Sequence, residues 1–284
     1  MAGQDAPARP HEDSRAQQAT THKATPSGTT IGSDQLRSGP VAGTALVDGK
    51  RLQYADVDGT AIVEGDIVLG TVQEMKARAA KPGLKSIGIP GQQRRWPNAT
   101  VPFEIDPALP NQQRVTDAIA HWQSRTRIRF VARTAANAAQ FPDFVRFVPG
   151  GGCTSQVGRR GGSQAINLAP GCTTGSTIHE IGHAVGLWHE QSREDRDQHV
   201  VINHANIIPA MRHNFDQNIA DGDDQGPYDF GSIMHYPAFN SFAINPNLPT
   251  IIPRRPLPPG VVMGQTTGLS QGDIDGVRLM YPAN

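Results

Sequence analysis

The sequence predicts an α+β fold with a sheet-forming first half and a loop-rich second half. Runs of β-branched and aromatic residues recur at 101–105, 128–131 and 144–148, and such runs are typical of strands. Residues 112–124 carry apolar side chains at helical spacing, which predicts an amphipathic helix between the first two runs. Beyond residue 190 the chain is rich in Pro and Gly, which favour loops. We therefore expect an N-terminal mixed sheet packed on two helices, followed by a loop-rich C-terminal subdomain that ends in a short helix.

The N-terminal part of the chain differs in character from the rest. Residues 1–40 are poor in apolar side chains and rich in Pro, Gly, Ser, Thr and Gln, so we expect them to be disordered. Residues 41–85 contain strand-like runs at 60–63 and 66–69 and a helix-like run at 73–79. A segment of this length is too short to be an independent domain, so we treat it as an adjunct of the region that follows.

Composition limits the classes of partner. The chain has 284 residues, a formal net charge of +0 and a pI near 7.2, so we expect neither nucleic acid nor an anionic membrane as a partner. The sequence has no apolar run of the length, about 18 residues, that a membrane-spanning helix needs. No signal peptide is visible, because residues 1–30 lack the apolar core of a secretory signal.

Three histidines and one glutamate stand at the spacing that a catalytic zinc ion requires. His179 and His183 are four positions apart, so on a helix both rings project from one face and can bind the same ion. Gly186 can end that helix in the left-handed conformation, which lets His189 complete a three-histidine site with a fourth position open to water. Glu180 lies beside His179, where it can act as a general base on that water. The pattern indicates a zinc peptidase; the alternative, a polar helix with solvated histidines, leaves each extra histidine unexplained.

The remaining histidines of this half of the chain are expected to be bystanders. None has metal spacing with the three above; they are His199, His204, His213 and His235. His121 lies on the amphipathic helix beside Ala118 and Trp122, and we expect it at the edge of the core, not at a metal.

The zinc motif resembles that of a known family. Residues 179–197, H-E-I-G-H-A-V-G-L-W-H-E-Q-S-R-E-D-R-D, are similar to the extended zinc signature of the astacin family, a branch of the metzincins. Residues 232–236, S-I-M-H-Y, resemble the family's Met-turn. The resemblance implies that Met234 packs beneath the metal and that Tyr236 is a further zinc ligand that swings away to stabilise the oxyanion. It also implies that Glu190 receives the new N-terminus after activation. Without the zinc motif, Met234 and Tyr236 would be interpreted as ordinary core and turn residues.

Further similarities cover nearly everything after residue 90. Residues 94–103 resemble the opening of astacin catalytic domains, 152–168 the segment before the zinc helix, and 264–275 the stretch before the last helix. The resemblance implies an astacin-like catalytic domain over residues 86–284. It also implies that a strand near 153–157 binds an extended substrate peptide as an added antiparallel strand.

The two cysteines of the chain match one disulfide of the family. Cys153 and Cys172 lie at corresponding positions, so the resemblance implies a bridge between them, and a bridge favours a secreted or extracellular protein. The alternative is two reduced, buried cysteines. The family's second bridge has no counterpart here, which makes the chain look more bacterial than animal.

Residues 41–85 have the position of a propeptide. Val63-Glu64-Gly65-Asp66 resembles the F-x-G-D motif by which astacin propeptides place an aspartate on the zinc, with Val in place of Phe. Asp66 is then the expected zymogen switch, since a carboxylate is a competent zinc ligand. The alternative is a strand that ends in a Gly-Asp turn. Activation requires an activating protease, for which the basic residues Lys76, Arg78, Lys81 and Lys85 offer sites in and next to the loop-prone stretch 81–85.

These observations predict a zinc-dependent endopeptidase made as a zymogen, with one zinc ion per chain. Its expected partners are protein or peptide substrates, its own propeptide as inhibitor and an activating protease, and we expect a monomer. The alternative is an inactive zinc-binding homologue that acts as a binding or adhesion module. Loss of Glu180 or Tyr236 would favour that alternative, and both residues are present.

Overall fold

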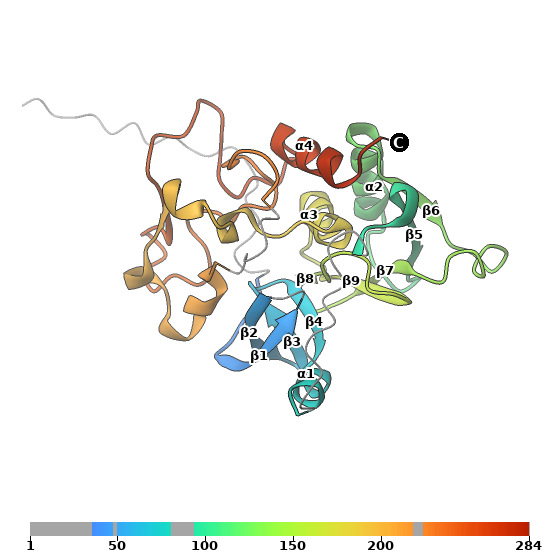
Figure 1. Ribbon diagram of the computed structural model, residues 1–284, viewed down its shortest axis with the longest axis horizontal. Helices are drawn as coiled ribbons and strands as arrows, with labels where there is room; N and C mark the ends of the chain where they lie inside the picture. The colour runs from blue at the N-terminus through green and yellow to red at the C-terminus, as the bar shows by residue number, and fades with distance from the viewer. Residues whose placement is uncertain (1–35, 48–49, 81–93, 218–223, 284) are drawn as a thin grey trace, which may run out of the picture.

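The computed structural model describes residues 36–47, 50–80, 94–217 and 224–283. Within these ranges the chain forms a four-stranded, a five-stranded and a two-stranded sheet. Figure 1 shows the four-stranded sheet of the N-terminal residues below the helix that carries the zinc motif, and the loop-rich C-terminal region to one side. The α+β class predicted from the sequence is confirmed.

Residues 36–80 form a small unit, which we call the N-terminal unit. Its strands β1 (Val41–Val47), β2 (Lys50–Val57), β3 (Thr60–Val63) and β4 (Ile67–Thr71) pair antiparallel in chain order, and helix α1 (Val72–Ala79) follows. Thr71 caps α1: its hydroxyl accepts from the Glu74 N–H while the Glu74 carboxylate accepts from the Thr71 N–H. Alternate residues of β2 are buried, so this sheet has a hydrophobic core of its own; its fully or nearly fully buried members include Leu52, Tyr54, Ile67 and Met75.

The sequence predicted β3, β4 and α1 to within two residues, but it did not locate β1 and β2. The expectation of disorder at residues 1–40 falls mostly outside the described residues; residues 36–40 lead into β1.

The five-stranded sheet contains the predicted strands and a further strand at 163–168 that the sequence did not locate. Its strands are β5 (Thr100–Ile105), β6 (Arg129–Ala132), β7 (Phe144–Pro149), β8 (Cys153–Thr154) and β9 (Ser163–Leu168), in the order β6-β5-β7-β9-β8. All neighbours are parallel except β8, which runs antiparallel to β9 at the edge. The strand expected at 153–157 is shorter than predicted, because Ser155 pairs with Ile67 of the N-terminal unit instead of with β9.

Two helices cover this sheet, as expected. Helix α2 (Gln113–Arg125) and helix α3 (Thr174–Val185) pack against each other and enclose the main hydrophobic core. Trp122 of α2 is fully buried and donates its indole N–H to the Ile178 carbonyl of α3 at 3.0 Å. Cys153 and Cys172 are joined in a disulfide that ties β8 to the start of α3.

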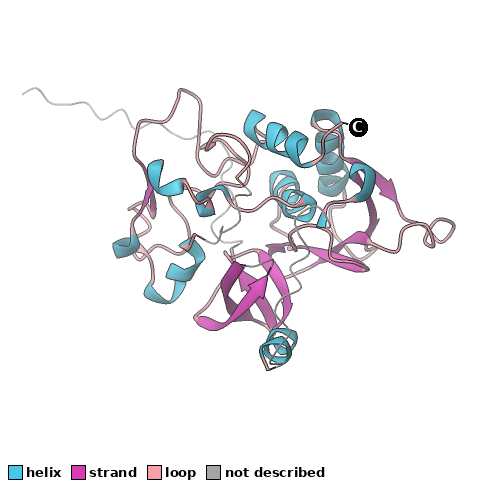
Figure 2. Cartoon of the chain, viewed as in Figure 1, coloured by secondary structure: helices cyan, strands magenta, loops and turns pink. Residues whose placement is uncertain are grey.

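The C-terminal region is loop-rich, as predicted. Figure 2 shows short helical turns separated by long loops in this region. Its regular elements are the two-stranded sheet of β10 (Val200–Ile202) and β11 (Ile251–Pro253) and the closing helix α4 (Gln271–Met280). The 3-10 turns are η2 (Pro97–Ala99, before β5), η3 (Glu190–Ser192), η4 (Arg196–Gln198), η5 (His204–Asn206) and η6 (Pro209–Phe215).

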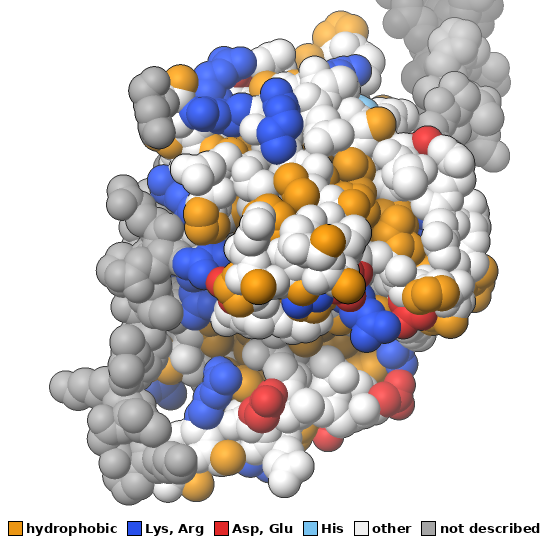
Figure 3. Space-filling model, turned by 90° about the vertical axis from the view of Figure 1, so that its right-hand side faces the viewer, with side chains coloured by type: hydrophobic (Ala, Val, Ile, Leu, Met, Phe, Trp, Pro, Cys, Tyr) orange, Lys and Arg blue, Asp and Glu red, His pale blue; other side chains and the backbone are white. Residues whose placement is uncertain are grey.

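Charged side chains of both signs lie on the surface. Figure 3 shows basic and acidic side chains interspersed on one face of the molecule. Among the described residues, no helix is long and apolar enough to cross a bilayer.

Candidate metal centre

Helix α3 positions the first two histidines. It begins at Thr173, whose hydroxyl accepts from the Ser176 N–H, and it ends at Gly186, which has a φ of 119°. Only Gly adopts this conformation without steric cost, so the helix stops where the sequence predicted. His179 and His183 are both buried and lie one turn apart on the same face.

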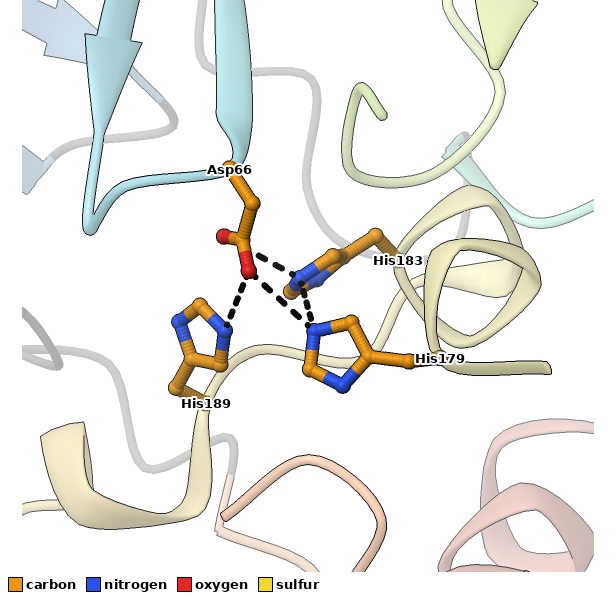
Figure 4. A group of neighbouring side chains, drawn as sticks. All are labelled: Asp66, His179, His183 and His189. Carbon is orange, nitrogen blue, oxygen red and sulfur yellow. Dashed lines mark hydrogen bonds and ion pairs between the residues drawn. The ribbon is translucent and has the colours of Figure 1, made fainter. Parts of the chain in front are cut away.

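His189 reaches the same point from the loop after Gly186. The structure brings one ligand atom from each of His179, His183, His189 and Asp66 within 4.8 Å of one another. Figure 4 shows the three rings turned toward the carboxylate of Asp66, which lies just before β4. Asp66 Oδ2 lies 3.2 Å from His189 Nε2 and 3.3 Å from His179 Nε2, and Asp66 Oδ1 lies 3.6 Å from His183 Nε2.

The other nitrogen of each ring is held from behind. His179 Nδ1 lies 2.7 Å from the Ile233 carbonyl, and His183 Nδ1 lies 2.8 Å from the Leu187 carbonyl. A carbonyl can only accept, so both Nδ1 atoms carry the proton and both Nε2 lone pairs point to the centre. His189 Nδ1 lies 2.7 Å from Glu64 Oε2, a contact that the sequence did not predict.

These residues fit a zinc ion. His179 Nε2 and His183 Nε2 lie 3.1 Å apart, and two lone pairs facing each other at that distance repel unless a cation or proton lies between them. Two nitrogens bound tetrahedrally to one zinc ion at 2.0–2.1 Å are themselves about 3.3 Å apart. Three neutral imidazoles and one carboxylate are a donor set that zinc accepts. No other cluster of three or more such side chains with this spacing occurs in the part of the chain that the structure describes.

The electrostatics of the cluster favour a positive charge at its centre. Burial lowers the pKa of His189, but Asp66 and Glu64 outweigh it and raise that pKa to about 10. Burial also acts to raise the pKa of Asp66, yet the charge of His189 and the close contacts with all three rings hold it well below its usual value. Burial lowers the pKa of His183 to about 4, so this ring is neutral, as a metal ligand must be.

Glu180 is buried beside this cluster. Its Oε2 has no hydrogen-bond partner among the described residues. Burial, and then the negative charge of Asp66, raise the pKa of Glu180 well above its usual value. A buried carboxyl oxygen without a partner is costly, and such groups cluster at sites of function.

The turn at Met234 packs directly under α3. A Cβ placed on Gly182 would lie 2.6 Å from Met234 Sδ, so the absence of a side chain at Gly182 is what allows this approach. Asp273 of α4 holds the turn, since its carboxylate accepts from the Ile233 N–H at 3.0 Å and from the Ser232 hydroxyl at 2.6 Å. This turn thereby places the Ile233 carbonyl where it accepts the hydrogen bond of His179 Nδ1.

Tyr236 lies beside His189 with its hydroxyl occupied. The two rings meet edge to face with centroids 4.8 Å apart, and Tyr236 is buried. Its hydroxyl donates a hydrogen bond to the Glu64 carbonyl of the N-terminal unit. Burial raises the pKa of Tyr236, and Asp66 and Glu64 add to that effect, so the hydroxyl stays protonated and able to donate.

Glu190 is not one of the clustered residues. Its carboxylate accepts from the Asp229 N–H at 2.7 Å and lies 3.6 Å from Arg193 Nε. Burial raises the pKa of Glu190 to about 8, although both of these partners act to lower it.

The histidines expected to be bystanders lie outside the cluster. His235 is bonded to the Tyr228 hydroxyl at 2.8 Å, and His199 stacks on the Tyr228 ring. His121 Nε2 accepts from the Leu269 N–H at 3.0 Å, so its role is structural.

The N-terminal unit reaches the cluster along the edge of the five-stranded sheet. Ile67 and Ser155 form a parallel bridge: the Ser155 N–H donates to the Asp66 carbonyl at 3.0 Å and the Val68 N–H to the Ser155 carbonyl at 2.7 Å. Ser38, further upstream, is hydrogen-bonded to Asn214 at 2.9 Å, a second contact between the N-terminal unit and the rest of the chain. The sequence did not predict Glu64 or Ser38 as contacts; the only available signal was the polar residue inside the V-E-G-D motif.

The comparison with known families decides the assignment. The family model described as Astacin, a peptidase family, matches residues 88–282. The chain belongs to the astacin family. This membership makes the matched region, residues 88–282, an astacin-family zinc metalloendopeptidase with zinc as its cofactor.

Several curated astacin-family proteins are similar to the chain. Bone morphogenetic protein 1 homolog of Strongylocentrotus purpuratus is 39% identical over 218 residues, 74% of this chain and 32% of that protein. Tolloid-like protein 2 of Homo sapiens is 39% identical over 72% of this chain and 20% of its own length. Zinc metalloproteinase nas-13 of Caenorhabditis elegans is 35% identical over 77% of this chain and 49% of its own length. The chain therefore spans half or less of these relatives. They come from animals, so they give no support to the bacterial affinity inferred from the cysteine count.

Solved structures share the astacin fold. High choriolytic enzyme 1, a hatching enzyme zinc-protease from Oryzias latipes, is 35% identical and superposes with a TM-score of 0.59 over 67% of this chain and 94% of that chain. Myroilysin is 18% identical with a TM-score of 0.50, a likeness that concerns the fold alone.

Proposed function

We propose that this chain is the latent form of a zinc endopeptidase, in which residues 41–85 are the propeptide and residues 86–284 the catalytic domain. The observation that carries the proposal is the position of the Asp66 carboxylate. Its oxygens contact the Nε2 atoms of all three histidines, at the place where the attacking water would otherwise be bound. A carboxylate in this place would be the fourth ligand of a tetrahedral zinc site and would close it. The proposed zymogen switch is therefore Asp66, and the propeptide is an inhibitor held in the same chain.

The direction of the propeptide supports this proposal. Ile67 pairs with Ser155 in a parallel sense, whereas we expect a substrate peptide to add to this edge antiparallel. The propeptide would thus occupy the substrate edge with its peptide bonds reversed. Its Glu64 carbonyl also takes the hydrogen bond of Tyr236, which in the active enzyme we assign to the oxyanion.

The chemistry we propose uses two residues of the chain directly. Zinc, when bound to His179, His183 and His189, would lower the pKa of water and polarise the scissile carbonyl. Glu180 then accepts a proton from the attacking water and delivers it to the leaving amine nitrogen. The Tyr236 hydroxyl donates a hydrogen bond to the oxyanion as the carbonyl carbon becomes tetrahedral. Met234 acts only by supporting α3 and the Ile233 carbonyl.

Latency would end with removal of the propeptide by an activating protease. The cleavage site that we expect, within 81–85, lies outside the described residues. After cleavage, Glu190 is the proposed partner of the new N-terminus; in the described part of the chain its buried carboxylate contacts the Asp229 N–H and Arg193. The disulfide supports secretion, because such bridges persist in oxidising compartments. We further propose a monomer that acts on protein or peptide substrates.

A casein assay tests this function. We would compare the full chain, its Asp66→Ala variant, a chain that starts at Ser86, and that shorter chain with Glu180→Ala, with zinc content measured for each. We expect activity in the Asp66→Ala variant and in the shorter chain, none in the full chain, and none after Glu180→Ala although zinc is retained. Equal activity of the full chain and the shorter chain would refute latency. Absence of activity in every form that holds zinc would favour a binding module instead.

A further inference from the structure

The three histidines differ in what holds their outer nitrogens. His179 Nδ1 and His183 Nδ1 are bonded to the Ile233 and Leu187 carbonyls, which belong to the catalytic domain. The partner of His189 Nδ1 is Glu64 Oε2, which belongs to the N-terminal unit 125 positions earlier in the chain. Removal of the propeptide therefore leaves two rings supported and takes away the partner of the third.

Glu64 is held firmly in this position. Glu64 and His189 are both fully buried. The Glu64 carbonyl accepts from the Tyr236 hydroxyl, and the next carbonyl, that of Gly65, accepts from the Arg37 N–H at 2.7 Å. Glu64 has a φ of +49°, an uncommon conformation for a residue with a side chain. Such a conformation persists only where the surroundings over-determine it, and here they aim the carboxylate at His189.

We propose that Glu64 is a positioning residue for the metal centre, one that orients His189 for zinc in the latent form only. This proposal rests on the proposed function, in which the three histidines hold zinc and residues 41–85 are the propeptide. The carboxylate of Glu64 fixes the orientation of the His189 ring and makes its Nε2 a stronger donor, as outer carboxylate partners of zinc-bound histidines do. The propeptide thus supports the ion twice: Asp66 from the open side, and Glu64 through His189. The latent chain is expected to release zinc more slowly than a chain without the Glu64 carboxylate.

The test is the rate at which the full chain loses zinc to an excess of a chromogenic chelator. Glu64→Gly removes the side chain and suits the positive φ, and Glu64→Gln keeps an oxygen that can accept from Nδ1. The matched control is Asp58→Asn, which removes one negative charge of the same unit at another residue of positive φ; Asp58 is exposed and pairs with Arg37. We expect zinc release about 10- to 100-fold faster for Glu64→Gly, an intermediate rate for Glu64→Gln, and no change for Asp58→Asn.

A second readout separates orientation of the ligand from general loosening of the fold. In the full chain loaded with Co²⁺, Glu64→Gly is expected to change the visible absorption spectrum of the ion, while Asp58→Asn leaves it unchanged. Equal zinc-release rates and equal spectra for the wild type and Glu64→Gly would overturn the proposal. A rate increase of the same size in Asp58→Asn would overturn it too, since it would assign the effect to charge alone. Casein activity of the same preparations is scored separately: an active full chain contradicts latency, whereas the zinc-release comparison still decides the role of Glu64.

Discussion

Individual side chains decide the chemistry, and Glu180 lies in an unusual environment. It is buried with an oxygen that has no hydrogen-bond partner in the described part of the chain. The adjacent Asp66 raises its pKa further. Withdrawal of the propeptide would remove that negative charge and bring the pKa of Glu180 down toward the range useful for a general base.

We expect Glu180→Gln in the activated enzyme to lower kcat by about 10²- to 10⁴-fold, because the amide cannot accept a proton. Zinc content should stay at the wild-type value, since Glu180 is not among the clustered ligand atoms. Steady-state kinetics with metal analysis measure both. A variant that keeps more than about a tenth of the wild-type kcat would remove Glu180 from the role of general base.

Tyr236→Phe tests the hydroxyl alone, because the ring that packs on His189 is kept. In the activated enzyme we expect kcat to fall by about 10²- to 10³-fold with little change in KM, as for the loss of one oxyanion donor. In the full chain the same change removes the bond to the Glu64 carbonyl, so latency should weaken. A fall confined to KM would contradict the assignment and indicate a role in substrate binding.

Glu190 makes the stability of the full chain depend on pH. Its pKa of about 8 in the folded state exceeds the ordinary value of 4.5, so between these values the unfolded chain releases this proton and the folded chain keeps it. Stability therefore falls as pH rises through this window, by up to about 5 kcal/mol from this residue. Glu190→Gln exchanges no proton here, so its Tm should decline less than that of the wild type between pH 5 and pH 8. Parallel Tm curves for the two proteins would contradict this prediction.

Packing between elements sets the frame around these side chains. Helix α3 carries two ligands; the Met234 turn packs against it at Gly182, and Asp273 of α4 holds that turn. A Gly inside a helix ordinarily costs about 1 kcal/mol relative to Ala, so Gly182 is kept for space and not for helix formation.

Gly182→Ala is expected to destabilise the chain in spite of the better helix propensity of Ala. The added methyl group would lie 2.6 Å from Met234 Sδ, and overpacking of a core typically costs about 1–3 kcal/mol. Thermal unfolding of the variant measures the loss, and zinc content reports whether the Ile233 carbonyl still supports His179. Gly226→Ala is the control for the loss of Gly alone: Gly226 is exposed, an added Cβ there would meet no atom within 4 Å, and any loss of stability would come from its positive φ. A rise in Tm for Gly182→Ala would contradict this prediction, because it would show that the Met234 turn can shift to accept the methyl group without loss of stability.

At the scale of the whole molecule, the metal centre lies where the N-terminal unit meets the region matched by the astacin family. Asp66 comes from one part and the three histidines from the other, so zinc would join the two. The remaining contacts include the Ile67–Ser155 bridge and the packing of Trp188 and Val157 against the core of the N-terminal unit.

Removal of zinc should therefore lower the stability of the full chain. A ligand present at 100 times its Kd stabilises the state that binds it by about 2.7 kcal/mol, which corresponds to about 5–10 °C in Tm for a chain of this size. Calorimetry before and after dialysis against a chelator measures the loss, and added Zn²⁺ should restore it. Asp66→Asn is expected to reduce the effect, since one ligand is weakened. A Tm independent of zinc in the full chain would contradict a metal bound at this junction.

Local spacing was sufficient for much of this molecule. The four-residue interval between His179 and His183 implies one helical face wherever the helix lies, and Gly186 ends the helix through its own backbone freedom. Strands such as β7 and helices such as α2 follow from periodic apolar residues that any sheet or helix of this class would bury. The resemblance to astacins added the disulfide and suggested Asp66, from motifs that are themselves short.

Only the tertiary structure decided how distant segments meet at the site. Asp66 and His189 are separated by 123 positions and Glu64 and Tyr236 by 172, and no periodicity of the chain relates them. Their contacts depend on the four-stranded N-terminal sheet, which meets the rest of the chain through the bridge of Ile67 with Ser155, just beyond the edge strand β8. The spacing of side chains determines which residues share one face of a helix or strand, whereas the packing of distant elements determines which residues that face contacts. That packing placed the Glu64 carboxylate against His189 Nδ1.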